Sequence, residues 1–315
     1  MKAHGLRHAA ALLLLAAPLC AQSPAAAPAT PRATDRLAVA YLTLEYVMRD
    51  HPPEGEAAES ANRSFDRASV AFFGGRMSEA FDSIAVLTAR LQPDSAARAR
   101  TAAAAQRRYD ALPPLTRRIA NGAAGHPVRI HVPRGNGPFP VVIALHGVGG
   151  SEHMFMEAYG AGVLRQMADE QGFIAVSPRT TGFTAAVFDS LLSQLGREVP
   201  VDTTRIFVIG HSMGGAAAWS LARQRTGRIA AVACIASPCG STADSEPLPP
   251  ALSVAGALDP IATPARVDSA AAVGIAAGRE IEYVLVEGVG HTFVVGGALP
   301  GVVTWLMAHR LGSAR

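Results

Sequence analysis

The strongest constraint on the fold is an alternation between apolar runs and helix-compatible stretches across residues 125–313. Many of the apolar runs are nearly continuous, which is typical of strands in a parallel sheet that helices cover on both faces. Seven such runs lie at residues 128–132, 140–147, 173–178, 205–210, 230–237, 252–259 and 281–288. Helix-compatible stretches lie between most of them and after the last, at residues 154–171, 183–198, 213–226, 264–278 and 299–311. The pattern predicts an α/β domain built on a doubly wound, mostly parallel sheet.

Residues 35–115 have a different pattern, with apolar residues at helix-like spacings. Breaks fall at residues 52–53, 74–75 and 93, which are Pro or Gly. The sequence therefore predicts an N-terminal all-α helical region of about four helices. Such a region either packs as an appendage or forms a cap or partner surface over the active site. The pattern leaves both open, and fold-level placement alone favours the appendage.

The N-terminus is typical of an exported protein. Lys2 and Arg7 precede an apolar run that is too short to span a membrane, and Ala21 supplies a small residue for cleavage. We expect a signal peptide over residues 1–21 and a flexible Pro/Ala-rich linker over residues 22–34. The expected location is the periplasm or the medium, without stable membrane association. Cys20 leaves a lipoprotein as the less favoured interpretation, because Leu19 is bulkier than that processing usually accepts.

The charge balance and the residue types exclude several classes of function. Removal of residues 1–21 removes Lys2, Arg7 and no acidic residue, which takes the formal net charge from +3 to +1. A nearly neutral chain gives no electrostatic case for a nucleic-acid partner. No lysine remains, so a Schiff-base lysine or a Ser–Lys pair is excluded for the mature protein. No Cys/His cluster has metal-ligand spacing, and we expect neither a metal nor a cofactor.

Two cysteines, Cys234 and Cys239, remain in the mature chain. An oxidising compartment permits a disulfide between them, whereas the alternative is a buried strand residue and a loop thiol. Extended chain holds their Cα atoms too far apart for a bridge, so pairing requires a tight turn at residues 237–238. The sequence leaves the pairing open.

A candidate nucleophile lies where the run at 205–210 meets a helix-compatible stretch. The spacing Gly210-x-Ser212-x-Gly214 between a strand and a helix predicts a sharp turn that lifts the Ser212 hydroxyl clear of the sheet. A serine hydroxyl needs a base, and in this arrangement the base follows the serine in the chain. The two downstream histidines are His291, which follows a strand, and His309, which we expect inside the terminal helix. We assign His291 as the general base.

The base needs a carboxylate that orients the imidazole and stabilises the imidazolium. Asp259 is the one acidic residue between Ser212 and His291 that combines the end of a strand run with the start of a loop. Asp244, in the loop after the preceding strand, is the alternative.

A glycine-rich loop, LHGVGG, follows the run at 140–147 and can point backbone N–H groups at the site. With the amide of Met213 it predicts an oxyanion hole, with Val148 as the first choice for the second donor and Gly149 as the next. His146 is interpreted as a residue that braces this loop, and His211 as a flank of the serine turn.

The motifs LHGVGG, GHSMGG, GALDP and GVGH, in this order, resemble those of the α/β-hydrolase superfamily, and the match covers residues 125–313. Within the superfamily, the chain resembles secreted feruloyl and acetyl-xylan esterases, polyhydroxybutyrate-depolymerase-like proteins and prolyl-oligopeptidase-type catalytic domains. The resemblance lies in the stretch HGVGGSEHMF and in the lack of a large insertion. The resemblance implies a Ser–His–Asp hydrolase. The helical region lies outside the match and is too short for the propeller of many oligopeptidases.

These observations predict a serine hydrolase that cleaves small-molecule or polymer-derived carboxylic esters through an acyl-enzyme. The alternatives are a serine peptidase of the prolyl-oligopeptidase type and a non-catalytic binding protein with a hydrolase fold. Residues 179–190 are expected to line one wall of the site, where Arg179 either meets a substrate carboxylate or forms a surface ion pair. The sequence predicts no particular oligomeric state.

Overall fold

An eight-stranded sheet lies at the centre of the part of the chain that the structure, a computed structural model, describes: residues 33–122, 124–240 and 247–312. The predicted signal peptide, most of the linker, Cys20 and Asp244 lie outside these residues. The strands are β1 (Arg117–Ile119), β2 (His126–His131), β3 (Phe139–Leu145), β4 (Ile174–Pro178), β5 (Val201–His211), β6 (Ala231–Ile235), β7 (Ala251–Gly256) and β8 (Ile281–Val286). Their order is β1-β2-β4-β3-β5-β6-β7-β8.

The pairing confirms the predicted sheet. β3 to β8 are parallel to one another, whereas β2 pairs antiparallel with both β1 and β4. Strand β1 was not expected, because its three residues, RRI, are too few and too charged to give a strand pattern. It adds to the edge of the sheet through Ile119, which is opposite His126.

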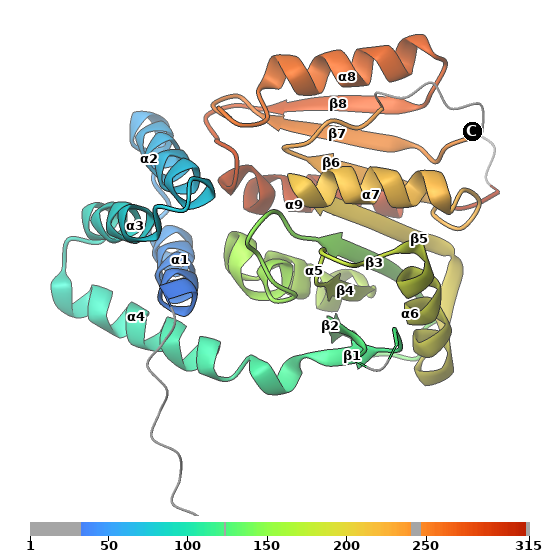
Figure 1. Ribbon diagram of the computed structural model, residues 1–315, viewed down its shortest axis with the longest axis horizontal. Helices are drawn as coiled ribbons and strands as arrows, with labels where there is room; N and C mark the ends of the chain where they lie inside the picture. The colour runs from blue at the N-terminus through green and yellow to red at the C-terminus, as the bar shows by residue number, and fades with distance from the viewer. Residues whose placement is uncertain (1–32, 123, 241–246, 313–315) are drawn as a thin grey trace, which may run out of the picture. The chain divides into compact units, whose positions relative to one another are not determined.

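Helices cover both faces of the sheet (Figure 1). The elements are α5 (Val163–Gln171) and α9 (Phe293–Met307) on one face and α6 (Ala185–Glu198), α7 (Met213–Gln224) and α8 (Pro264–Ala276) on the other. Strand β3 alternates between two apolar cores, since Val142 packs in the core with α5 and α9 while Val141 and Ile143 pack in the core with α6 and α7. Continuous apolar strands are thus buried on both sides.

The terminal helix differs from its prediction. It begins at Phe293 and ends at Met307, so the expectation that His309 lies within it is wrong. The amide of Ala308 bonds to the Trp305 carbonyl and closes the last turn, and Nδ1 of buried His309 lies 2.8 Å from the same carbonyl oxygen. His309 therefore contacts the helix end, where carbonyl groups have no partner inside the helix.

Within residues 33–116, four α-helices precede the sheet: α1 (Ala33–Asp50), α2 (Gly55–Phe73), α3 (Met77–Leu91) and α4 (Ser95–Asp110). They confirm the predicted all-α region and its breaks. Asp94 follows the break at Pro93 and begins α4 by accepting hydrogen bonds from the amides of Ala96 and Ala97.

The helical region and the sheet share one core. Tyr41 of α1 and Phe65 of α2 lie in the same apolar cluster as α9, and the rings of Phe65 and Phe293 are 4.5 Å apart. A buried ion pair adds a second connection, because Glu157 accepts hydrogen bonds from Arg108 of α4 and from Arg129 of β2. The apolar contacts hold α1 and α2 against α9, and Glu157 links α4 to β2.

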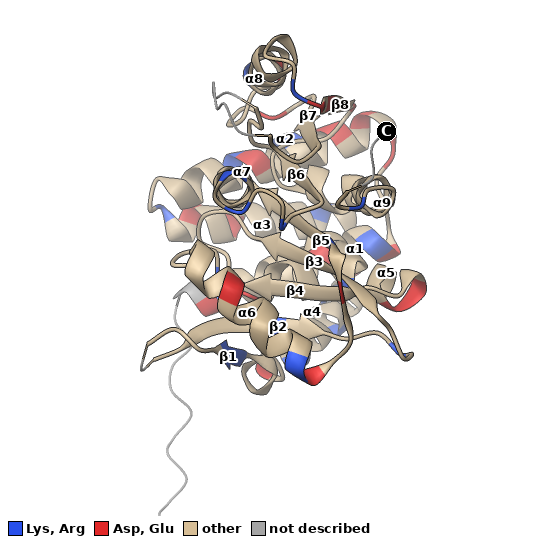
Figure 2. Ribbon diagram, turned by 90° about the vertical axis from the view of Figure 1, so that its right-hand side faces the viewer, with Lys and Arg blue, Asp and Glu red and all other residues tan. Residues whose placement is uncertain are grey.

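Charged residues lie mainly on helices and turns (Figure 2). Strands β3, β4, β6 and β7 carry none, whereas β5 carries Asp202 and Arg205 near its start. Within residues 33–122, 124–240 and 247–312, no helix combines the length and the hydropathy that a membrane crossing requires.

Candidate active site

Ser212 lies in a sharp turn between β5 and α7. Its backbone has φ 53° and ψ −119°, a conformation that L-residues rarely adopt. The turn brings backbone atoms so close that a Cβ on Gly210 or on Gly214 would lie 2.0 Å from a carbonyl oxygen. The Ser212 amide donates to the Ile235 carbonyl over 2.9 Å, which anchors the turn to β6. The two glycines of the predicted spacing are therefore required by close approach.

The structure brings the three predicted site residues together. Ser212 Oγ lies 3.0 Å from Nε2 of His291, and Nδ1 of His291 lies 2.8 Å from Oδ2 of Asp259. They follow β5, β8 and β7, at the carboxyl edge of the sheet. The alternative carboxylate, Asp244, lies outside the described residues, and the alternative base, His309, contacts the end of α9 instead.

Asp259 is held in a fixed orientation. Its Oδ1 accepts hydrogen bonds from the amides of Ile261 and Ala262 over 2.8 and 2.9 Å, which leaves Oδ2 for His291. A carboxylate only accepts, so His291 carries its proton on Nδ1 and Nε2 is free to accept from the Ser212 hydroxyl. This tautomer is the one that a general base needs.

His211 holds the backbone of the His291 loop. Its Nε2 lies 2.9 Å from the His291 carbonyl oxygen, and its Nδ1 lies 2.8 Å from the Tyr159 hydroxyl. Burial lowers the pKa of His211 to about 3, so the ring is neutral, donates from Nε2 and accepts from Tyr159. His211 flanks the serine turn as expected and in addition positions the base.

His146 braces the glycine-rich loop, in agreement with its interpretation. Its Nδ1 donates to the Gly147 carbonyl over 2.8 Å, and its Nε2 accepts from the Thr180 amide over 3.1 Å. Burial lowers the pKa of His146 and keeps the ring neutral. Arg179 forms the ion pair that was its alternative role, with Glu152 at 2.9 Å.

The sequence did not indicate two side chains of α2 that contact the base loop. Asn62 Oδ1 accepts from the Gly290 amide over 2.8 Å, and Asp66 Oδ1 accepts from the His291 amide over 3.0 Å. Both side chains are buried. The interpretation of the helical region as an appendage is therefore wrong, because α2 bonds directly to the backbone of the candidate base. The available signal was Asn62, Asp66 and Ser69 within the apolar stripe of α2, where polar residues need buried partners.

Asp66 has an unusual environment. Burial and the nearby Asp259 carboxylate raise the pKa of Asp66 to about 7, although the bond from the His291 amide acts in the opposite direction. Its Oδ2 has no hydrogen-bond partner among the described residues. A protonated Asp66 satisfies this environment better than a carboxylate does.

A cavity of about 150 Å³ opens beside Ser212. We call it the Ser212 cavity; it is lined by α1 (Leu37, Tyr41), α2 (Phe65, Phe72), α3 (Ile84) and residues 147–150. Val148 and Gly149, the predicted oxyanion donors, lie in this lining, and Met213 is the first residue of α7 directly after Ser212. Residues 179–190 do not line the cavity, so that expectation is wrong; the helical region supplies the wall instead.

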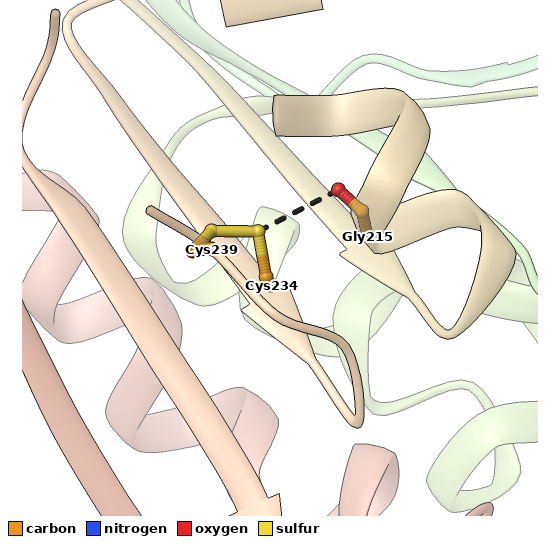
Figure 3. The surroundings of a disulfide bond; sticks show 3 residues. All are labelled: Gly215, Cys234 and Cys239. Carbon is orange, nitrogen blue, oxygen red and sulfur yellow. Dashed lines mark hydrogen bonds between the residues drawn. A yellow bond between two sulfur atoms is a disulfide. The ribbon is translucent and has the colours of Figure 1, made fainter. Parts of the chain in front are cut away.

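Cys234 and Cys239 form a disulfide with their Cα atoms 5.8 Å apart. The chain turns between them, as pairing required. Figure 3 shows the sulfur of Cys234 beside Gly215, whose carbonyl oxygen lies 3.5 Å away in the first turn of α7. The bridge thus supports the helix that begins behind Ser212. Among the described residues, no three His, Cys, Asp or Glu side chains are placed to hold a metal ion.

Comparison with solved structures gives the fold. A thermostable esterase has a TM-score of 0.51 and 18% identity over 62% of this chain and 63% of its own. An esterase from Pyrobaculum calidifontis has 0.50 and 20% over 61% and 83%. An S-formylglutathione hydrolase from Agrobacterium tumefaciens has 0.50 and 18% over 62% and 94%. No model of a protein family matches the chain, and no curated protein matches it significantly.

The likeness to these structures shows that the sheet and its helices have the α/β-hydrolase fold, as the motifs implied. The chain spans slightly less than two thirds of the thermostable esterase, 63% of its length.

Proposed function

We propose that the protein is a serine hydrolase that cleaves carboxylic esters through an acyl-enzyme. The observation that carries the proposal is the chain of hydrogen bonds from Ser212 to His291 to Asp259 at the carboxyl edge of the sheet. Sites in open α/β sheets lie at this edge. The solved structures of similar fold include two named as esterases and one named as an S-formylglutathione hydrolase, which supports acyl transfer as the chemistry.

The first half of the reaction transfers the acyl group to the enzyme. Ser212 Oγ attacks the ester carbonyl carbon while His291 Nε2 takes the hydroxyl proton, and Asp259 stabilises the resulting imidazolium. The tetrahedral intermediate collapses when the carbon–oxygen bond to the alcohol breaks and His291 returns the proton to the departing alcohol. In the second half a water molecule repeats these steps and releases the acid.

The oxyanion of each tetrahedral intermediate needs two donors. The Met213 amide, at the N-terminus of α7, is one, and the Val148 amide is the other, with Gly149 as its alternative. The positions of Val148 and Gly149 in the lining of the Ser212 cavity support this assignment. His146 and Thr180, which bond to the loop that carries these amides, hold it in place.

The test is turnover of p-nitrophenyl butyrate by the wild-type protein and by Ser212→Ala. We expect kcat to fall at least ten-thousand-fold in the variant, because the nucleophile of a triad acts as a unit with its base. A fluorophosphonate probe should label the wild type and leave Ser212→Ala unlabelled. Ser64→Ala is the matched control, since this half-buried serine lies on α2 away from the cavity.

The same samples distinguish the other functions. Turnover of an aminoacyl amide at a rate equal to or above that of the ester would favour a peptidase. A folded wild-type protein that the probe does not label would favour a binding protein. Undiminished ester turnover by Ser212→Ala would contradict the proposal.

Export of the protein is a further part of the proposal. The pattern of residues 1–21 supports it, and so does the disulfide, because such bonds persist in oxidising compartments. Processing is tested by the mass of the mature protein. Loss of residues 1–21 without a lipid is the expected result, and a lipid on Cys20 would indicate anchoring.

A further inference from the structure

We propose that the Ser212 cavity is the acyl-binding site and that it selects an apolar acyl group of about six carbon atoms. The inference rests on the proposed function and adds the substrate class to it. It also assigns a task to the helical region, since α1, α2 and α3 supply most of the cavity wall.

The wall is apolar and partly aromatic. Leu37 and Tyr41 come from α1, Phe65 and Phe72 from α2, and Ile84 from α3. Side chains of this kind bury hydrocarbon favourably and fix its place by shape.

No residue that lines the cavity in the described part of the chain is Asp, Glu, Lys or Arg. Glu45 lies behind the wall, and its Oε1 accepts a hydrogen bond of 2.5 Å from the Tyr41 hydroxyl. Burial raises the pKa of Glu45 to about 7. The cavity therefore offers no cation that would pair with the free carboxylate of a dicarboxylic acyl group, whose desolvation would oppose binding.

The volume sets the size of the group. A dry apolar cavity of about 150 Å³ binds a benzene molecule, and the Ser212 cavity has about this volume. A six-carbon chain with its methyl end inward fills a similar space. An acetyl group leaves most of the wall uncovered, and a long chain extends beyond it.

The wall lies directly against the reacting groups. The Phe72 ring packs on Gly149 so closely that a Cβ there would lie 2.1 Å from it. The Phe73 ring lies edge-on to the His291 ring, with centroids 6.4 Å apart. An acyl chain in the cavity thus places its carbonyl between the glycine-rich loop and His291, where Ser212 attacks.

The experiment measures kcat/KM for p-nitrophenyl esters from acetate to dodecanoate. We expect the value to rise at least tenfold from acetate to hexanoate and to fall again beyond octanoate, since each fully buried methylene is worth about a fourfold factor. A maximum at acetate or at dodecanoate would overturn the inference.

Substitution of an alanine of the wall tests the location. Ala68 is buried on α2 and lines the cavity, so Ala68→Leu should lower kcat/KM for hexanoate about tenfold and change acetate less than threefold. Ala38→Leu, at a half-buried position of α1 in the same lining, serves if Ala68→Leu does not fold. Ala57→Leu, on the exposed side of α2, is the matched control and should change neither.

The outcomes separate the two proposals. Loss of turnover for every ester in the wild type would reject the proposed function and the acyl assignment with it. Turnover that depends on Ser212, but with a chain-length profile that Ala68→Leu and Ala38→Leu leave unchanged, would reject the acyl assignment alone. Calorimetry with hexan-1-ol gives a readout without catalysis. The Ser212→Ala variant should bind hexan-1-ol, and the Ala68→Leu variant should not. Equal binding by the two variants would contradict the location of the acyl group.

Discussion

The α/β region and the helical region contribute to one site in different ways. The α/β region provides Ser212, His291 and Asp259, which lie in loops at the ends of neighbouring parallel strands. The helical region supplies no group of this hydrogen-bonded chain; it provides an apolar wall and two side chains that bond to the His291 loop. The reacting groups therefore come from one part of the sequence, and their positioning comes partly from the same part and partly from the distant helix α2.

Substitutions in the two regions should affect activity and stability differently. A change at Ser212, His291 or Asp259 should remove nearly all activity and leave stability almost intact. A change among the α2 contacts should weaken both, because the same bonds hold the loop and satisfy buried backbone groups.

Asp259→Asn should have the largest effect in the α/β region outside the nucleophile. The amide would donate to His291 Nδ1, reverse the tautomer and leave Nε2 protonated, and kcat should fall about ten-thousand-fold. The measurement is kcat with p-nitrophenyl hexanoate, beside Asp268→Asn on the exposed face of α8 as a control. A loss below tenfold would show that another carboxylate orients the base, and a loss of about ten-thousand-fold in Asp244→Asn would then identify it as Asp244.

Asp66→Ala should have the next largest effect and tests the helical region. The variant leaves the buried His291 amide without its acceptor, and a small displacement of a general base costs up to about a hundredfold in rate. We therefore expect kcat to fall between about tenfold and a hundredfold with KM nearly unchanged.

Asp66→Asn is the conservative variant, since its carbonyl oxygen still accepts from the His291 amide. It should keep kcat within a few-fold of the wild type. Asp82→Ala, at an exposed position of α3, is the control for removal of an acidic residue from the helical region. Wild-type activity in Asp66→Ala would mean that the bond from α2 does not position the base, and the two regions would then be independent.

The sequence could predict the elements of the site that depend on local pattern. A strand, a turn with close glycines and a helix place Ser212, and chain order with strand ends places His291 and Asp259; the structure puts all three within hydrogen-bond distance. The role of α2 could not be predicted, because it depends on how a helix packs far along the chain. Asn62 is 228 residues from the amide that it binds. The place of Asn62 and Asp66 in the apolar stripe of α2 indicates burial, but only tertiary packing shows which backbone groups they contact.

The pH dependence of stability isolates the charge of Asp66. The folded state raises the pKa of this carboxyl from 3.8 to about 7, so between these values the folded protein binds a proton that the unfolded chain has released. Stability from this group is complete below pH 4 and is lost as pH rises through 7.

Asp66→Asn has no such proton, and other titrating groups, Glu45 included, are common to both proteins. The unfolding free energy of the wild type should therefore fall relative to Asp66→Asn between pH 4 and 7, by about 4 kcal/mol at most, and then stay level. Denaturant unfolding at pH 4.5, 6 and 8.5 measures the difference. Parallel free energies for the two proteins across this range would show that Asp66 is a solvated carboxylate, and that burial in the helical region does not control its charge.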